Sequence, residues 1–384
     1  MSNRVAYISA DRSPLLDLAL AGFSPLRISP SSKTRFDALV KSRPRDVAKF
    51  GFSISRMLSE LRKVRPAVVV LFEREDTRNI LPILFRELPE VRFISIQSAW
   101  YFESAHLHLW WPGDRRRLKV LLWGNYQIDL AARQGKDSRG RYAVGSLEAA
   151  LFSEFFKTDD QSVRESQICL VAKRKFGSAS AALTHQAIER KRIVETTLDF
   201  VSRFCDDMNL NAVIPADARR SPEELEADRV WLEGLGVGRT VKFTAERARL
   251  SVRRPEWFPL NHPLPTVGNF NALATAATSK LVIGNQNSAV IWQSLSLRFP
   301  VLAIGFGKHK FFEFPIRGPW SLHDPTYETF ADRAQRISEM PDHRYSVSDL
   351  AETRYLVNQE PENGTIGTLR NLVASALAGE NWDY

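Results

Sequence analysis

The chain contains little cysteine, with only Cys169 and Cys205 among its 384 residues. Two cysteines cannot build a disulfide framework or a four-thiolate zinc site, which excludes disulfide-rich secreted domains and zinc fingers. The sequence also has no apolar run of the roughly 18 residues that a membrane-spanning helix needs. Its first residues, MSNRVAYISADRS, lack the apolar core of a signal peptide. We therefore expect a protein of the reducing cytoplasm.

Several catalytic signatures are missing as well. The sequence has no G-x-G-x-x-G or P-loop pattern, which argues against the common nicotinamide and NTPase sites. Its seven histidines show no H-E-x-x-H spacing, and His106 and His108 alone do not make a metal site. We predict no bound metal and no resident cofactor.

Basic residues exceed acidic ones, 53 to 44, for a net charge of +9. They form short clusters at 115–117, 173–175, 190–192, 219–220 and 253–254. Because no long basic tail and no RNA-binding signature accompanies these clusters, we predict no nucleic-acid partner. Ligands that carry phosphate, or an anionic membrane surface, agree with the charge.

Short apolar runs alternate with helical patterns along the whole chain. A length of 384 residues suggests two domains. In the first half, strands are predicted at 5–9, 68–72, 93–96, 120–123 and 142–144, with helices at 54–64 and 77–87. In the second half, strands are predicted at 168–172, 212–215, 241–244, 281–284 and 301–305, with helices at 192–208 and 326–339. Such alternation is typical of α/β domains with parallel sheets.

The polar stretch 157–166 reads as a linker between the two halves. We expect an N-terminal Rossmann-like domain at 1–160 and a second one at 161–345. A helical tail at 346–384 would fold back onto the first domain. Ligands of open α/β sheets bind beyond the carboxyl ends of the strands, so the residues that follow each strand are the first site candidates.

The segment 278–307 carries the most specific pattern. An apolar strand runs into Gly284, Asn285, Asn287 and Ser288, and then into a helix. The free amide groups of that first turn, with the helix dipole, would suit a phosphate. Gln293 follows on the same helix, where its amide would reach a ribose hydroxyl. The alternative is a plain strand, turn and helix with a polar cap and a buried glutamine.

This segment resembles the donor-binding part of GT-B glycosyltransferases. More narrowly, the chain is similar to bacterial surface-carbohydrate biosynthesis proteins of lipopolysaccharide and capsule loci. Three other stretches carry the likeness in the family's order: FISIQSA at 93–99, VLLWGNYQID with YAVGSLEAALF between 120 and 152, and FPIRGPWSLHDPTYETFADRAQR at 314–336. The family usually has Glu where this chain has Gln293, and Gln-Asn or Gln-His where it has Gln97-Ser98.

The resemblance implies two Rossmann-like domains that face each other across a cleft. It also implies a nucleotide-sugar donor, with a CMP-activated ulosonic acid as one option, and a surface-polysaccharide or lipid-linked glycan acceptor. Alternatives are a sugar-nucleotide epimerase, a polyol-phosphate transferase and a non-catalytic nucleotide-binding scaffold. The absence of a D-x-D motif fits a reaction without a catalytic metal.

Charged residues after the predicted strands supply candidates for the chemistry. Glu73 and Asp76 follow the strand at 68–72, where a carboxylate would deprotonate an acceptor hydroxyl. Their alternative role is to cap a helix that starts near Thr77. Lys173 and Arg174 follow the strand at 168–172 and would offset donor phosphates, unless they form a solvated surface cluster. Further acceptor or cleft candidates are Gln97, Ser98, His262 and Lys308.

The stretch 109–141 combines Trp110, Trp111 and Trp123 with eight basic and three acidic residues. Aromatic side chains beside cations suit an anionic membrane surface, which would place the protein on the inner face of a membrane. The alternative is a loop anchored by tryptophan with solvated arginines.

Overall fold

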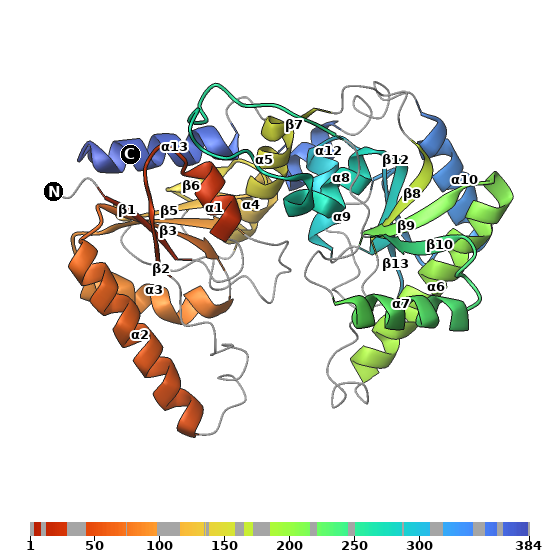
Figure 1. Ribbon diagram of the computed structural model, residues 1–384, viewed down its shortest axis with the longest axis horizontal. Helices are drawn as coiled ribbons and strands as arrows, with labels where there is room; N and C mark the ends of the chain where they lie inside the picture. Colours follow the sequence, from red (N-terminus) through yellow and green to blue (C-terminus); the bar gives the residue numbers. More distant parts are fainter. Residues whose placement is uncertain are drawn as a thin grey trace. The chain divides into compact units, whose positions relative to one another are not determined.

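The structure is a computed structural model that describes residues 4–8, 13–28, 44–73, 75–97, 116–133, 135, 138–157, 165–171, 185–215, 221–244, 250–285, 288–307, 318–340, 350–358 and 364–382. Its contacts divide the chain into two compact units (Figure 1). Unit 1 consists of Met1–Leu151, Arg254–Pro263 and Tyr355–Tyr384. Unit 2 consists of Phe152–Arg253 and Leu264–Arg354.

Unit 1 is built on a sheet of six parallel strands in the order β2-β1-β3-β4-β5-β6. The strands are β1 Val5–Ile8, β2 Leu26–Ile28, β3 Val68–Glu73, β4 Arg92–Gln97, β5 Leu118–Leu122 and β6 Arg141–Ala143. The inner strands are buried on both faces, which explains their largely apolar sequences.

Helices cover both faces of this sheet. The core on one face joins strand residues to side chains of α2 Pro44–Val64 and α3 Glu75–Glu87. The other face is covered by α1 Ser13–Ala19 and by the C-terminal α13 Thr365–Leu377 (Figure 1). The unit also contains α4 Asn125–Arg133, whereas α5 Leu147–Phe155 and α12 Leu350–Leu356 run across the unit boundaries.

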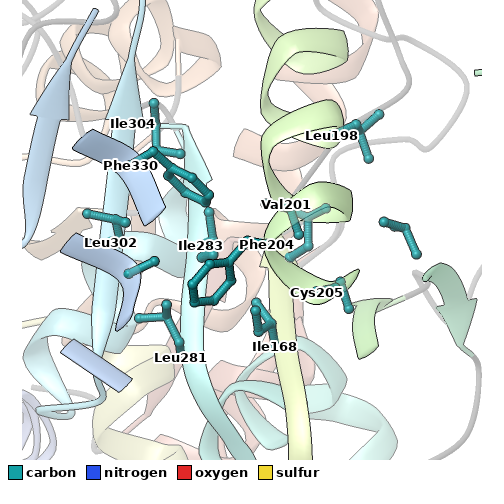
Figure 2. Close-up of a cluster of buried hydrophobic side chains, with 14 of the residues drawn as sticks. Ile168, Leu198, Val201, Phe204, Cys205, Leu281, Ile283, Leu302, Ile304 and Phe330 are labelled. Carbon is teal, nitrogen blue, oxygen red and sulfur yellow. The ribbon is translucent and has the colours of Figure 1, made fainter. Parts of the chain in front are cut away.

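Unit 2 repeats the plan with six parallel strands in the order β10-β9-β8-β12-β13-β14. The strands are β8 Glu165–Val171, β9 Asn211–Pro215, β10 Val241–Thr244, β12 Ser279–Asn285, β13 Val301–Gly305 and β14 Ser321–His323. Figure 2 shows the core on one face, where side chains of α6 His185–Met208 and α10 Tyr327–Glu339 meet strand residues. The other face carries α8 Asn271–Ala277 and α9 Ala289–Ser296.

Three further elements complete unit 2. These are α7 Pro222–Gly234, the short 3-10 helix Val267–Phe270, and an antiparallel pair of β7 Phe156–Lys157 with β11 Ser251–Val252. None of the helices in the described ranges is both long enough and apolar enough to cross a bilayer.

The two parallel α/β sheets confirm the fold class predicted from the sequence. The sequence did not predict β2 and β14, because these edge strands have only three residues each and no continuous apolar run. The start of α3 also differs from the prediction. This helix begins at Glu75, so Asp76 lies in its first turn and not in a preceding loop.

Candidate functional site

The strand order of unit 2 reverses between β8 and β12. From β8 the chain adds β9 and β10 on one side, and it then adds β12, β13 and β14 on the other. Loops at such a reversal diverge to opposite faces and open a ligand crevice at the carboxyl edge. Here Val171, the last residue of β8, pairs with Gly284 of β12. The segments that begin at Lys173 and at Asn285 therefore leave neighbouring strands at this reversal.

Part of this predicted donor site lies outside the described residues, namely Lys173, Arg174 and Asn287. Asn285 is the last residue of β12, but its side chain is also outside the described part. The described members of the predicted site are Gly284, Ser288 and Gln293.

Gly284 is required by packing within the protein. A Cβ atom at this position would lie 2.8 Å from the carbonyl oxygen of Val171 and 3.2 Å from Cδ1 of Ile291. The glycine thus allows β12 to lie close to β8 and α9. The sequence interpretation had assigned it to the close approach of a ligand instead.

Ser288 occupies the N-cap position of α9, with φ −89° and ψ 125°. Its side chain accepts no capping hydrogen bond, although its carbonyl accepts one from the amide of Ile291 at 3.1 Å. The residue is buried, with 7% of its surface exposed. Its hydroxyl is therefore not used to stabilise the helix end, unlike that of Thr326, which accepts from the amide of Thr329 at the start of α10.

Gln293 is enclosed by protein, with 1% of its surface exposed. It lies in the second turn of α9, between the fully buried Trp292 and Ser294. The ring of Trp292 packs against that of Trp320, with centroids 5.9 Å apart. In this conformation the glutamine is part of the interior of unit 2.

The sheet of unit 1 has its own reversal, between β1 and β3, because β2 lies on one side of β1 and β3 to β6 lie on the other. Glu73 is the last residue of β3, and Leu71 pairs with Ile8 at the end of β1. The backbone of Glu73 therefore lies at the carboxyl edge beside the reversal. The side chains of Glu73 and Asp76 lie outside the described part of the structure.

Gln97 forms a brace between β4 and the end of β5. Its side-chain oxygen accepts the backbone amide of Trp123 at 2.8 Å, and its backbone carbonyl accepts the indole N–H at 3.1 Å. Both residues are buried. These contacts give Gln97 a structural role where the sequence predicted an acceptor contact. Ser98 lies outside the described residues.

His262 belongs to the segment Arg254–Pro263 of unit 1. Its ring lies 5.1 Å from that of Phe258, and its carbonyl accepts a hydrogen bond of 3.1 Å from the guanidinium of Arg254. These contacts hold the segment in a compact loop. The remaining candidate, Lys308, lies outside the described residues.

Three residues of the proposed membrane-facing stretch 109–141 make their contacts within the protein. Trp123 is buried, and Arg117 donates to three backbone carbonyls at and just beyond the end of α3. Lys119 is also buried, and its ammonium donates to the carbonyl of Trp382 at 3.0 Å. The tryptophans at 110 and 111 lie outside the described residues.

Sequence analysis missed the contribution of the C-terminal segment to this edge of unit 1. Asn358 donates two hydrogen bonds, from its backbone amide to the carbonyl of Trp123 at 2.7 Å and from its side-chain amide to the carbonyl of Ala143 at 2.9 Å. The hydroxyl of Thr365 donates to Val144 at 2.9 Å. The segment therefore lies across the carboxyl ends of β5 and β6. The glycines at 124 and 145, which leave room for this segment, were the available signal.

The titratable groups of the described residues offer no reactive thiol and no metal cage. Burial raises the pKa of the Cys169 thiol to about 12, and burial with the nearby Asp206 carboxylate does the same for Cys205. Both thiols are therefore protonated at neutral pH. The described ranges contain no group of three or more His, Cys, Asp or Glu residues that could hold a metal ion.

No known protein family matches the chain, and no curated protein matches it in sequence. Solved structures do share its fold. UDP-N-acetylglucosamine 2-epimerase from Rickettsia bellii has a TM-score of 0.58 at 9% identity, over 98% of this chain and 97% of that one. UDP-GlcNAc 2-epimerase from Methanocaldococcus jannaschii, in complex with UDP-GlcNAc and UDP, has a TM-score of 0.55 at 10% identity, over 97% and 99%.

A third similar structure is a glycosyltransferase from Rickettsia africae ESF-5, with a TM-score of 0.51 at 10% identity over 98% of this chain and 99% of that one. At such low identity the likeness concerns the fold alone. The chain thus has the GT-B fold, with two Rossmann-like α/β units.

Proposed function

We propose that the protein is a glycosyltransferase of the GT-B type. It would move a sugar from a nucleotide-activated donor to a surface-polysaccharide or lipid-linked glycan acceptor. The observation that carries this proposal is the reversal of strand order in unit 2. Two segments chosen from the sequence for phosphate binding, after β8 and after β12, leave neighbouring strands there.

The donor would bind at this edge of unit 2. The turn from Asn285 to Ser288 would contact the phosphate through its amides, and Lys173 and Arg174 would offset the negative charge. The absence of a capping hydrogen bond from the Ser288 side chain supports a role outside helix capping. Because these cations would stabilise the departing nucleotide phosphate, we expect no metal requirement. A ribose contact by Gln293 would need its side chain to become accessible.

The acceptor would bind at the reversal in unit 1. Glu73 is the better candidate for the base, because it ends β3 at the carboxyl edge, whereas Asp76 sits in the first turn of α3. A carboxylate in a first turn is stabilised by the helix dipole, which favours a capping role for Asp76. Glu73 would take the proton of the acceptor hydroxyl as that oxygen attacks the anomeric carbon and the nucleotide leaves. We further propose that this reaction takes place at the cytoplasmic side of a membrane.

A thermal-shift screen of the full chain against CMP, CDP, UDP, GDP and their sugars tests the donor site. A ligand at about 100 times its dissociation constant should add roughly 2.7 kcal/mol to the free energy of unfolding, which is visible as a rise in Tm. Ser288→Pro should reduce that rise by changing the start of α9. If no nucleotide or nucleotide sugar raises Tm, the proposal is wrong.

An epimerase is the second candidate. Two of the three solved structures described above are UDP-N-acetylglucosamine 2-epimerases. Product analysis separates the two reactions. An epimerase changes the nucleotide sugar without any acceptor, whereas a transferase releases free nucleotide only when an acceptor is present. Transfer of a polyol phosphate to the acceptor, with release of a nucleoside monophosphate, would identify a polyol-phosphate transferase. Nucleotide binding without turnover of any donor would favour a non-catalytic scaffold.

A further inference from the structure

The basic pair Arg253-Arg254 lies at a place where the chain passes from one unit to the other. The chain makes this passage four times, at 151/152, 253/254, 263/264 and 354/355. Arg253 is the last residue of its part of unit 2, and Arg254 is the first residue of the short segment that belongs to unit 1. The two arginines are thus neighbours in sequence but members of different units.

Arg253 donates hydrogen bonds to the backbone of unit 2. Its Nε donates to the carbonyl of Glu154 at 2.7 Å and its Nη2 to that of Ser153 at 2.9 Å. Its own amide donates to Phe155 at 2.8 Å. These three carbonyls belong to the last turn of α5, where carbonyl groups lack partners within the helix and a cation is favoured.

The strands next to Arg253 are fixed by hydrogen bonds and by ring packing. β11, directly before it, pairs with β7, directly after α5, and this pairing joins Val252 to Phe156. The ring of Phe156 lies 5.5 Å from that of Phe270 within the same unit. Two sequence-distant parts of the chain are therefore tied together at the point where the first segment of unit 2 begins and ends.

Arg254, in contrast, makes its contacts within unit 1. Its guanidinium donates to the carbonyl of Pro259 and, at 3.1 Å, to that of His262, and it lies 5.4 Å from the ring of Phe258. The same segment packs onto the body of unit 1, because Arg370 of α13 stacks on Trp257, with 4.9 Å to the ring centroid. All these partners belong to unit 1.

We propose that Arg253 and Arg254 form a two-sided anchor, in which each arginine fixes one unit to one side of a single peptide bond. Movement of one unit relative to the other must then rotate the backbone dihedral angles that flank this planar peptide bond, and the anchor limits the amplitude of that rotation. Domains of one chain generally move relative to one another unless a large apolar interface prevents it. The inference does not depend on the reaction that the protein catalyses.

Distance measurements between spin labels on the two units test the anchor. Exposed positions for the labels are Lys63→Cys on α2 and Ala227→Cys on α7, and both native cysteines are buried and so protected from labelling. Arg253→Ala and Arg254→Ala should each broaden the distribution of distances. Arg333→Ala is the matched control, because Arg333 is also exposed and donates to a backbone carbonyl, that of Pro319, but within unit 2 and far from 253 in sequence.

Hydrogen exchange at position 253 supplies a second measurement. Arg253→Ala removes the two guanidinium bonds that hold α5 against this residue, so the amide at 253 should exchange about tenfold faster. The control variant should leave that rate unchanged. Unchanged label distances in both anchor variants, or equal broadening in Arg333→Ala, would overturn the proposal.

Discussion

At the scale of single residues, several polar side chains that could have faced a ligand act within the protein. Gln97 holds Trp123, and Lys119 is buried against Trp382. Arg253 binds backbone carbonyls in place of phosphate. A polar group that leaves water needs hydrogen-bond partners, and backbone carbonyls at helix and strand ends provide them. Sequence alone does not reveal which partner a polar residue takes.

Gly284→Ala should destabilise the protein by about 1–3 kcal/mol, because the added methyl group would press on the carbonyl of Val171 and on Ile291. Gly367→Ala on α13 is the control. A Cβ there meets nothing within 4 Å, so this variant should gain roughly 0.5–1 kcal/mol. Urea unfolding of both variants measures the difference, and equal stabilities would remove the packing explanation for Gly284.

Glu73→Gln should lower the transfer rate about 100-fold or more, because the amide cannot accept the acceptor's proton. Donor affinity should not change, since the donor site is assigned to unit 2. Glu90→Gln, at an exposed position of unit 1, is the control. Steady-state kinetics with a donor found in the thermal-shift screen separate kcat from KM. Normal turnover by Glu73→Gln would move the base to another residue.

At the scale of elements, the position of a strand in its sheet decides which loops meet. β8 and β12 are more than a hundred residues apart in sequence but are neighbours in unit 2, and β1 and β3 are neighbours in unit 1. The reversal of strand order lies at the central pair of the unit 2 sheet, and between the second and third strands of the unit 1 sheet. Two helices of unit 2 begin with different caps, because the side chain of Thr326 caps α10 after β14 whereas that of Ser288 does not cap α9 after β12.

Ser288→Ala and Thr326→Ala make a matched pair for these two caps. Thr326 accepts from the amide of Thr329 at 3.3 Å, so its replacement should cost about 0.5–2 kcal/mol and leave nucleotide binding intact. Ser288 makes no such bond, so its replacement should cost less stability and weaken nucleotide binding. Chemical unfolding and nucleotide titration of each variant measure both effects. A large loss of stability in Ser288→Ala, with unchanged affinity, would make the serine purely structural.

At the scale of the whole molecule, the chain passes from one unit to the other several times, so each unit consists of separate segments of the sequence. Tyr355–Tyr384 returns to unit 1, where α13 lies against the sheet and Arg92 donates to the carbonyl of Ala376 at 3.1 Å. Unit 1 therefore needs both ends of the chain to complete its sheet covering. Each unit encloses its own apolar core.

The buried thiols of unit 2 make stability fall in alkali. The pKa of each thiol is about 12 in the folded protein, against roughly 8.5 in an unfolded chain. The contribution of these thiols to the free energy of unfolding is thus complete below about pH 8.5. It is lost as the pH rises toward 12, by about 1.4 kcal/mol per pH unit for each thiol.

Urea unfolding between about pH 8 and pH 10 measures this loss, since ordinary tyrosines ionise only near 10. The double variant with Cys169→Ala and Cys205→Ala should show a shallower dependence on pH, although it is less stable at every pH because of the cavities. An identical slope in the wild-type protein and the double variant would contradict the assignment.

Much of the fold could be predicted because its signals are local. The strand at 68–73 begins with a run of five apolar residues, and the helix at 327–339 has apolar residues at helical spacing, so short windows identify both. The edge strands β2 and β14 were missed because they are half exposed and contain no such run. The candidate site was predicted as a set of residues that follow strands. The reversal of strand order then showed which of those segments begin side by side.

The sequence by itself determined the parallel α/β class, the two-domain character and the strand ends that carry polar residues, because burial on both faces demands unbroken apolar runs. Only the tertiary structure decided that Gly284 serves the contact of β12 with β8 and that Gln97 braces Trp123. It alone also showed that Arg253 and Arg254 serve different units. These roles depend on partners that are distant in the chain, and the free energy of a polar or close contact is set by those partners and not by the residue type.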